Sequence, residues 1–122
     1  MIREAIAECA LDDVAFDDNG GTRRCYCFKP SFIGFSGHFP GYPILPAFIQ
    51  IMTALATMEE RKGHELVLDS VKKAKFHIEI RPDAIIEVTC VERVVLGKPT
   101  IEATLRVDGR LASECTLVCQ AP

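Results

Sequence analysis

The stretch PAFIQIMTALATMEERK, residues 46–62, decides the fold. Pro46 supplies the fixed φ of a first helical turn, and Gly63 is a typical residue just beyond a helix end. As far as Met58, the only polar residues are Gln50, Thr53 and Thr57. A helix that is apolar nearly all round must be buried on most of its sides. The stretch therefore predicts one buried helix from about Pro46 to Lys62.

Most of the remaining chain has the pattern of strands and turns. Apolar and polar side chains alternate over residues 73–81, and this period of two predicts a half-buried strand that Pro82 and Asp83 end. Further strands are predicted at about residues 85–95, over 101–107, and up to about Cys119. Asp108 and Gly109 join the last two as a hairpin, because both positions of a type I′ turn need positive φ. Three such strands in succession predict an antiparallel meander.

An N-terminal hairpin completes the predicted sheet. Apolar residues up to Phe16 lead into a turn at residues 17–21, and an extended segment follows from Thr22 to about Phe28. One buried helix with five or six antiparallel strands predicts an α+β hotdog fold, in which one long central helix is wrapped by a curled antiparallel sheet. Because a small sheet cannot enclose a helix alone, we expect a single domain over residues 1–122 that dimerises and continues the sheet.

Length, charge and composition limit the function classes. The chain has 122 residues, which suits one domain with a single core. Its net charge of −3 argues against nucleic acid as a partner, because phosphates select for a basic surface. No apolar run reaches the ~18 residues that span a bilayer, so no membrane partner is expected. Residues 1–4 include an acidic side chain and no apolar h-region follows, so we expect no signal peptide and a cytoplasmic protein.

The six cysteines do not have the pattern of a metal site or a disulfide framework. The sequence contains no C-x-x-C pair, and no histidine stands where a zinc finger would need it. Cys25 and Cys27 lie two apart, as do Cys115, Leu117 and Cys119 in succession, which fits one face of a strand. We expect buried, reduced thiols that pack as small apolar side chains, and neither a metal nor another cofactor.

The segment FSGHFPGYPILPA, residues 35–47, carries the chemistry. Its prolines and glycines forbid both helix and strand, so they predict a rigid loop that leads directly into the buried helix. His38 is then held beside the positive end of a helix whose first backbone N–H groups are free. Because Pro46 has no N–H, the first donors are those of Ala47 and Phe48. A base beside such donors suits the removal of a proton next to a carbonyl.

This loop also carries a family signature. The run from Gly37 to Gly41, with Pro43 and Pro46, resembles the signature of the 3-hydroxyacyl-acyl-carrier-protein dehydratases of fatty-acid biosynthesis, the FabA/FabZ type. Weaker similarity covers most of the chain, at residues 74–76, 86–89, 107–109 and 115–119. The resemblance implies a hotdog fold, a lyase that removes water from a 3-hydroxyacyl group, and an acyl-carrier-protein or coenzyme A thioester as substrate.

The resemblance also implies roles for single residues. In the family, the histidine removes the α-proton of the thioester, and a backbone N–H at the start of the helix polarises the carbonyl. These positions match His38 and Ala47, and the substrate would further contact Phe39, Gly41 and Met52. The family's acid comes from the other subunit, fourteen residues after that subunit's own histidine. In this chain the position is Met52, which cannot donate a proton.

No neighbouring residue replaces the acid in the sequence pattern. Gln50 lies about 200° round the helix from Met52, and Glu59 lies roughly 10 Å farther along it. Three functions therefore stay open. The first is a dehydratase subunit that forms a heterodimer with an acid-bearing hotdog subunit. The second is a homodimer with altered chemistry, such as thioester hydrolysis or slow dehydration by His38 alone. The third is a non-catalytic acyl-thioester-binding subunit.

Basic residues near one strand suggest a docking surface for a carrier protein. Positive charge gathers at Lys72, Lys73, Lys75 and Arg81 of an otherwise acidic chain. Acyl carrier proteins are acidic, so this charge would steer them towards the strand, although a solvated strand face explains it equally well. His64 and His77 are expected to be ordinary exposed residues.

Overall fold

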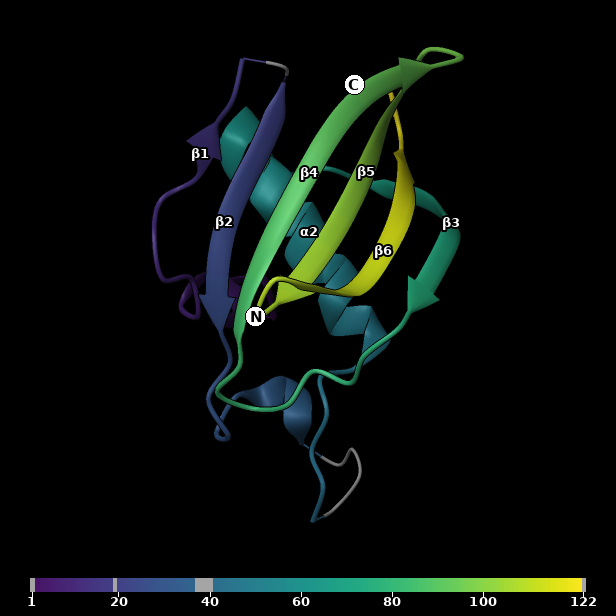
Figure 1. Cartoon of the computed structure of the whole chain (residues 1–122). Helices are drawn as coiled ribbons and strands as arrows, with labels where there is room; N and C mark the ends of the chain where they lie inside the picture. Colours follow the sequence, from purple (N-terminus) through teal and green to yellow (C-terminus); the bar gives the residue numbers. More distant parts are fainter. Residues whose placement is uncertain (1, 19, 37–40, 122) are drawn as a thin grey trace.

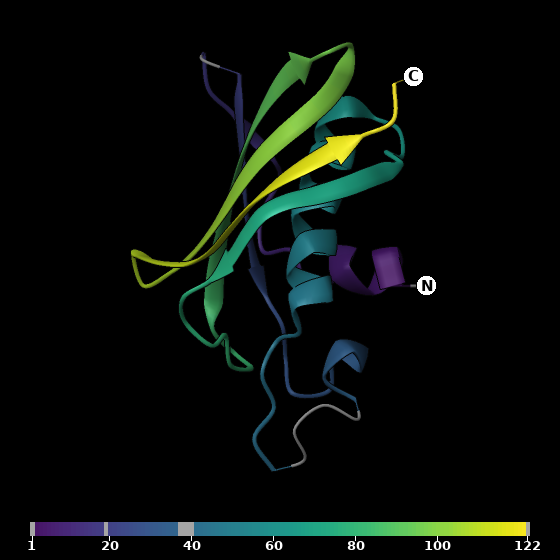
Figure 2. The same cartoon turned by 90° about the vertical axis from the view of Figure 1, so that its right-hand side faces the viewer.

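The computed structural model describes residues 2–18, 20–36 and 41–121, and within them one long helix lies against a six-stranded antiparallel sheet (Figures 1 and 2). The strands are β1 (Ala15–Phe16), β2 (Gly21–Cys27), β3 (Leu68–Phe76), β4 (Ile85–Val95), β5 (Lys98–Val107) and β6 (Arg110–Cys119). Their order in the sheet is β1-β2-β4-β5-β6-β3. The helices are α1 (Ile2–Ala7) and α2 (Ala47–Lys62), with a 3-10 turn, η1 (Ile33–Phe35).

The helix α2 begins and ends where its sequence predicts. Pro46 is the N-cap, and Gly63 ends the helix with a positive φ of 79°. The side chains of Ile49, Ala54, Leu55 and Met58 are nearly or fully buried and belong to the core. This burial against the sheet is the main source of the helix's stability, because an isolated helix of this length is marginal in water.

Two buried threonines of α2 are satisfied within the helix. The hydroxyl of Thr53 donates to the carbonyl of Ile49 at 2.7 Å, and that of Thr57 donates to the carbonyl of Thr53 at 2.8 Å. Tyr26 of β2 lies with its hydroxyl 2.9 Å from Thr57 Oγ1. Because Thr57 has one hydroxyl proton and gives it to Thr53, Tyr26 must be the donor. This hydrogen bond joins the sheet to α2 in the centre of the core.

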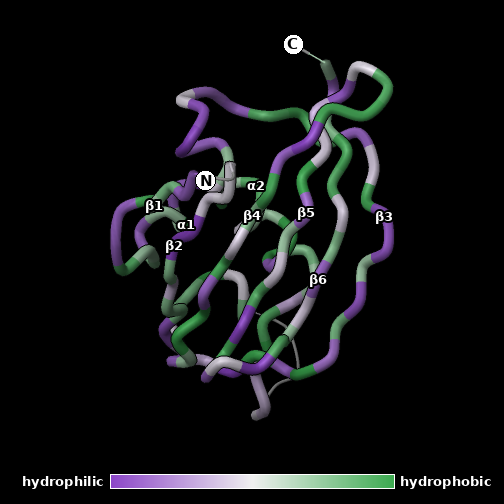
Figure 3. The backbone as a smooth tube through the Cα atoms, turned by 45° about the horizontal axis from the view of Figure 1, so that its top comes forward, coloured by the Kyte–Doolittle hydropathy of each residue, from purple (hydrophilic) through white to green (hydrophobic). Residues whose placement is uncertain are grey.

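The meander and both hairpins form as predicted. β4, β5 and β6 pair in succession, and β1 pairs with β2. Asp108 and Gly109 have positive φ values of 52° and 75°, as the hairpin prediction requires. Hydrophobic and hydrophilic segments alternate along these strands (Figure 3). In the described part of the chain, no helix is long and apolar enough to cross a membrane.

The bounds of one predicted strand were wrong. The alternation over residues 73–81 predicted a strand there, whereas β3 is Leu68–Phe76. The strand ends where the N–H groups of His77 and Ile78 both donate to the carbonyl of Ala112, at 2.7 and 3.1 Å, which interrupts the regular ladder. Beyond that point Ile80 is buried as part of a loop. The apolar positions of this loop therefore continued the strand pattern without continuing the strand.

Helix α1 was not predicted. It buries Ile6 fully, and Arg3 fixes it to α2 through two hydrogen bonds to the carboxylate of Glu59, at 3.0 and 3.1 Å. The hydrogen bond and the charge of Glu59 together raise the pKa of Arg3. Glu59 also accepts the N–H of Leu66 at 2.8 Å. Its carboxylate therefore holds α1, α2 and the chain after α2 together.

The six cysteines are free thiols, and four of them are buried, at Cys27, Cys90, Cys115 and Cys119. Burial raises the pKa of Cys90 to about 12 and that of Cys115 to about 11. These two thiols therefore stay protonated near neutral pH. They pack against other apolar side chains of the core, as predicted.

Candidate active site

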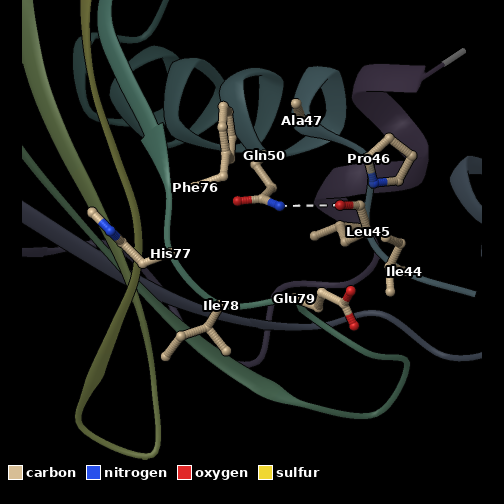
Figure 4. Close-up of a pocket in the computed structure, with 9 residues that line it drawn as sticks. All are labelled: Ile44, Leu45, Pro46, Ala47, Gln50, Phe76, His77, Ile78 and Glu79. Carbon is tan, nitrogen blue, oxygen red and sulfur yellow. Dashed lines mark hydrogen bonds between the residues drawn. The ribbon is translucent and has the colours of Figure 1, made fainter.

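A pocket of about 400 Å³ opens at the start of α2 (Figure 4). The lining residues come from the loop before α2, from the first turn of α2, and from the end of β3 with the loop that follows it. They are Ile44, Leu45, Pro46, Ala47, Gln50, Phe76, His77, Ile78 and Glu79. The end of the segment predicted to carry the chemistry therefore forms one wall of this pocket.

Hydrogen bonds and a stacked pair hold this wall in place. The N–H of Leu45 donates to the carbonyl of Ile80 at 2.7 Å, and the Leu45 side chain is buried. The Tyr42 hydroxyl donates to a carboxylate oxygen of Glu79 at 3.0 Å. The guanidinium of Arg81 lies 3.6 Å from the centre of the Tyr42 ring. The loop before α2 is thus fixed against the loop after β3, as a pre-organised site requires.

The first turn of α2 supplies backbone donors. The first hydrogen bond of the helix runs from the N–H of Gln50 to the carbonyl of Pro46, at 3.1 Å. The N–H groups of Ala47, Phe48 and Ile49 therefore have no carbonyl acceptor within the helix. Ala47 is exposed and lines the pocket. An N–H group here, with the positive end of the helix dipole, suits a carbonyl oxygen that gains negative charge.

Gln50 is a pocket residue that the sequence analysis missed. Gln50 faces away from Met52, but it lies one turn beyond Ala47 and lines the pocket. Its side chain is 6% exposed, and Nε2 donates to the carbonyl of Leu45 at 3.0 Å. Its Oε1 is buried and has no hydrogen-bond partner among the described residues. An amide side chain on a nearly apolar helix, three positions after a candidate donor, was the available signal.

His77 is exposed, as predicted. It also lines the pocket, which the sequence did not indicate. Its Nε2 lies 2.8 Å from a carboxylate oxygen of Glu114 on β6. The pair joins β3's end to β6 at the outer edge of the pocket. His64 is exposed, with Nδ1 2.9 Å from the carbonyl of Glu65.

The structure brings only part of the predicted site into this pocket. Ala47 lies in it, whereas His38 and Phe39 lie outside the described residues. Gly41 is exposed, has a positive φ of 81°, and is not one of the pocket's described lining residues. Met52 is half buried, packs against the core, and lies about 140° round α2 from Ala47. The roles of His38, Phe39, Gly41 and Met52 remain predictions.

Two carboxylates in the described part of the chain, one on α2 and one in the pocket wall, already have hydrogen-bond partners. Glu59 is held by Arg3 and by the N–H of Leu66, and Glu79 accepts the Tyr42 hydroxyl. Among the described residues, no cluster of three or more histidine, cysteine or acidic side chains is arranged to hold a metal ion. The described pocket thus combines an electrophilic helix end and a buried amide with the exposed side chains of His77 and Glu79.

Comparison with known proteins gives matches over most of the chain. The sequence model of the ApeI-like family, described as ApeI dehydratase, matches residues 17–110. The 3-hydroxyacyl-[acyl-carrier-protein] dehydratase FabZ of Streptococcus equi subsp. zooepidemicus is 36% identical over 94 residues, which cover 68% of this chain and 65% of that relative. FabZ of Clostridium novyi is 32% identical over 93 residues, covering 69% and 65%. The matched part of the chain thus spans just under two thirds of these relatives.

A solved structure with the same arrangement is the dehydratase heterocomplex ApeI:P from Xenorhabdus doucetiae. It aligns with a TM-score of 0.72 and 18% sequence identity, over 91% of this chain and 96% of that one. At this identity the likeness concerns the fold, and it confirms the predicted α+β hotdog class.

Proposed function

Because this chain belongs to the ApeI-like dehydratase family, we propose that it is a hydro-lyase subunit that dehydrates a 3-hydroxyacyl thioester. The observation that carries the proposal is the pocket at the start of α2, into which the rigid loop and the first turn of the helix bring Ala47. The substrate is the thioester of an acyl carrier protein or of coenzyme A. The name of FabZ, a curated relative, supports a carrier-bound substrate.

In the proposed reaction, His38 is the base and the N–H of Ala47 is the electrophile. His38 takes a proton from the carbon next to the thioester carbonyl, and the electrons of that C–H bond are delocalised onto the carbonyl as an enolate, from which they form the new C=C bond when the C–O bond breaks. The carbonyl oxygen gains charge during this step, and the helix end stabilises it. The C–O bond to the 3-hydroxyl then breaks, and the hydroxyl takes a proton and leaves as water.

The proton for the leaving hydroxyl must come from another group than Met52. Of the described carboxylates, Glu59 is held by Arg3, and Glu79, which lines the pocket, accepts the Tyr42 hydroxyl. We therefore propose that a second hotdog subunit supplies the acid, as a Glu or Asp at its position equivalent to Met52. The dehydratase heterocomplex ApeI:P supports an assembly of two different subunits.

The proposed contact between the subunits is the outer edge of β3. This strand is the last in the sheet order, and its other edge pairs with β6. Every side chain from Val71 to Phe76 is exposed, and an edge strand presents unpaired backbone groups to which another strand can add. Phe76 and His77, at the end of this strand, line the pocket. A partner strand along β3 would extend the sheet and bring partner residues close to the pocket.

Complementation between two variants tests the proposal. The double variant His38→Ala/Met52→Glu has an acid and no base, so by itself it should not dehydrate 3-hydroxybutyryl coenzyme A. Mixed with the wild-type chain, it should complete one site per mixed dimer, and the rate should exceed that of wild type alone by at least roughly 10²-fold. The control is His38→Ala, which has no acid. Mixed dimers no faster than wild type, or hydrolysis of the thioester instead of enoyl formation, would contradict the proposal.

A further inference from the structure

The side chain of Gln50 has an unused hydrogen-bond acceptor inside the pocket. Its Oε1 is buried and has no partner among the described residues, while the side chain as a whole is 6% exposed. A buried polar atom without a partner costs about 1–3 kcal/mol. A ligand that brings a donor to this oxygen would remove that cost. The unused acceptor therefore points to a ligand group with an O–H or N–H.

The orientation of the amide is fixed by its neighbour. Nε2 donates to the carbonyl oxygen of Leu45 at 3.0 Å (Figure 4). If the amide were turned round, Oε1 would face that carbonyl oxygen and repel it. Leu45 is itself anchored, because its N–H donates to the carbonyl of Ile80 at 2.7 Å. The free position of the amide is therefore an acceptor, and a ligand must supply the donor.

We infer that Gln50 determines substrate specificity by accepting a hydrogen bond from the 3-hydroxyl group of the acyl thioester. The inference rests on the proposed function, because it takes the ligand's carbonyl to lie at the N–H of Ala47. Gln50 is three residues farther along α2, about 4.5 Å along the helix axis. The 3-hydroxyl is attached two carbons beyond the carbonyl carbon, so its oxygen lies within a few ångströms of the carbonyl. The two contacts therefore match the spacing of the two groups on the ligand.

Burial distinguishes the hydroxyl from the other donors of such a ligand. The amide N–H groups of a pantetheine arm lie on the side that leads out to the carrier, whereas Gln50 is buried. Phe76 lies across the same pocket and is 46% exposed. An exposed ring changes rotamer within nanoseconds, so Phe76 can move aside when the acyl group enters. The acyl end, with its hydroxyl, thus reaches Oε1.

The same hydrogen bond assists the departure of water. When the hydroxyl receives a proton, its oxygen becomes more positive and its O–H becomes a stronger donor. The bond to Oε1 therefore strengthens in the transition state. Gln50 has no proton to give through Oε1, so it positions the leaving group and does not replace the missing acid.

Binding of two matched ligands tests the inference. The ligands are stable ketone analogues of 3-hydroxybutyryl- and butyryl-pantetheine, in which CH₂ replaces the thioester sulfur, with each enantiomer of the first used separately. Isothermal titration calorimetry measures their affinity for the wild-type chain, Gln50→Leu and Gln50→Met. Circular dichroism and thermal unfolding check that both variants fold.

Wild type should bind one enantiomer of the hydroxyl analogue about 2- to 12-fold more tightly than the butyryl analogue, as one neutral hydrogen bond predicts. In both Gln50 variants this preference should fall to about 1. Equal binding of the two analogues by wild type, or a preference that persists in a folded variant, would overturn the inference alone. Binding of neither analogue would overturn the proposed function as well.

Discussion

Replacing Met52 with Glu should turn a self-associated dimer into a complete dehydratase. Met52 stands at the family's acid position, fourteen residues after His38. In a dimer of Met52→Glu chains, each site would hold base, N–H donor and acid together. One positioned general acid contributes roughly 10²–10⁴-fold to a rate, so the gain in dehydration should lie in that range.

The cost in stability follows from the surroundings of Met52. Its side chain is half buried and packs against the core. A fully buried methionine contributes about 1.5–3 kcal/mol, so loss of half that burial should lower the free energy of unfolding by about 0.8–1.5 kcal/mol. Partial burial should also raise the pKa of the new carboxyl, which favours the protonated form that donates. The variant should therefore fold and be slightly less stable.

The assay is the conversion of 3-hydroxybutyryl coenzyme A to the enoyl thioester, followed by the absorbance of the conjugated product. The matched control is Met52→Gln, which has the same shape and cannot act as an acid. Met52→Glu should dehydrate the substrate roughly 10²–10⁴-fold faster than Met52→Gln. Urea unfolding should give similar free energies of unfolding for the two variants. If a folded Met52→Glu chain is no faster than Met52→Gln, the cleft serves different chemistry, and the reasoning from the acid position fails.

Three further predictions concern the base, the core and the buried thiols. His38→Ala should abolish α-proton chemistry and leave the circular dichroism spectrum unchanged; full activity in this variant would remove His38 from the mechanism. Thr57→Val should lower the free energy of unfolding by about 1–3 kcal/mol, because it leaves the Tyr26 hydroxyl buried without an acceptor, whereas Tyr26→Phe should cost only about 0.5–1.5 kcal/mol, since Thr57 keeps its bond to Thr53. Urea unfolding measures both, and the opposite ranking would show that Tyr26 is not the donor. Burial raises the pKa of Cys90 to about 12 and of Cys115 to about 11 from an ordinary 9.0, so above pH 9 the unfolded chain loses protons that the folded chain keeps. The free energy of unfolding should therefore fall as the pH rises from 9 to 11, and in Cys90→Ala it should fall less steeply with pH. An equal slope in the two proteins would contradict burial of this thiol.

The helix and the meander could be predicted because local chemistry fixes them. Pro46 and Gly63 set the ends of α2, and Asp108 and Gly109 adopt the positive φ values that their hairpin needs. The bounds of β3 could not be predicted, because at an exposed edge the burial of side chains no longer follows the alternation. Helix α1 has only six residues, too few to show a helical period.

The candidate site was predicted only in part for a similar reason. The loop and the helix end are consecutive in sequence, so their proximity could be inferred. The other wall of the pocket comes from Phe76 to Glu79, which reach it through the path of β3 along the far edge of the sheet. Gln50 was missed because it was judged as a substitute acid, whereas its position beside Ala47 gives it a place in the pocket as an acceptor.

The most direct test of the central claim is exchange of the α-proton of butyryl coenzyme A with deuterium from solvent. This reaction needs the base and the N–H donor and needs no acid, so it does not depend on a partner's carboxyl group. Proton NMR of the recovered thioester measures it, with His38→Ala as the control. We predict that the wild-type chain catalyses the exchange and that His38→Ala does not. Binding of butyryl coenzyme A without any exchange above the His38→Ala rate would contradict a catalytic role and identify the chain as an acyl-thioester-binding subunit.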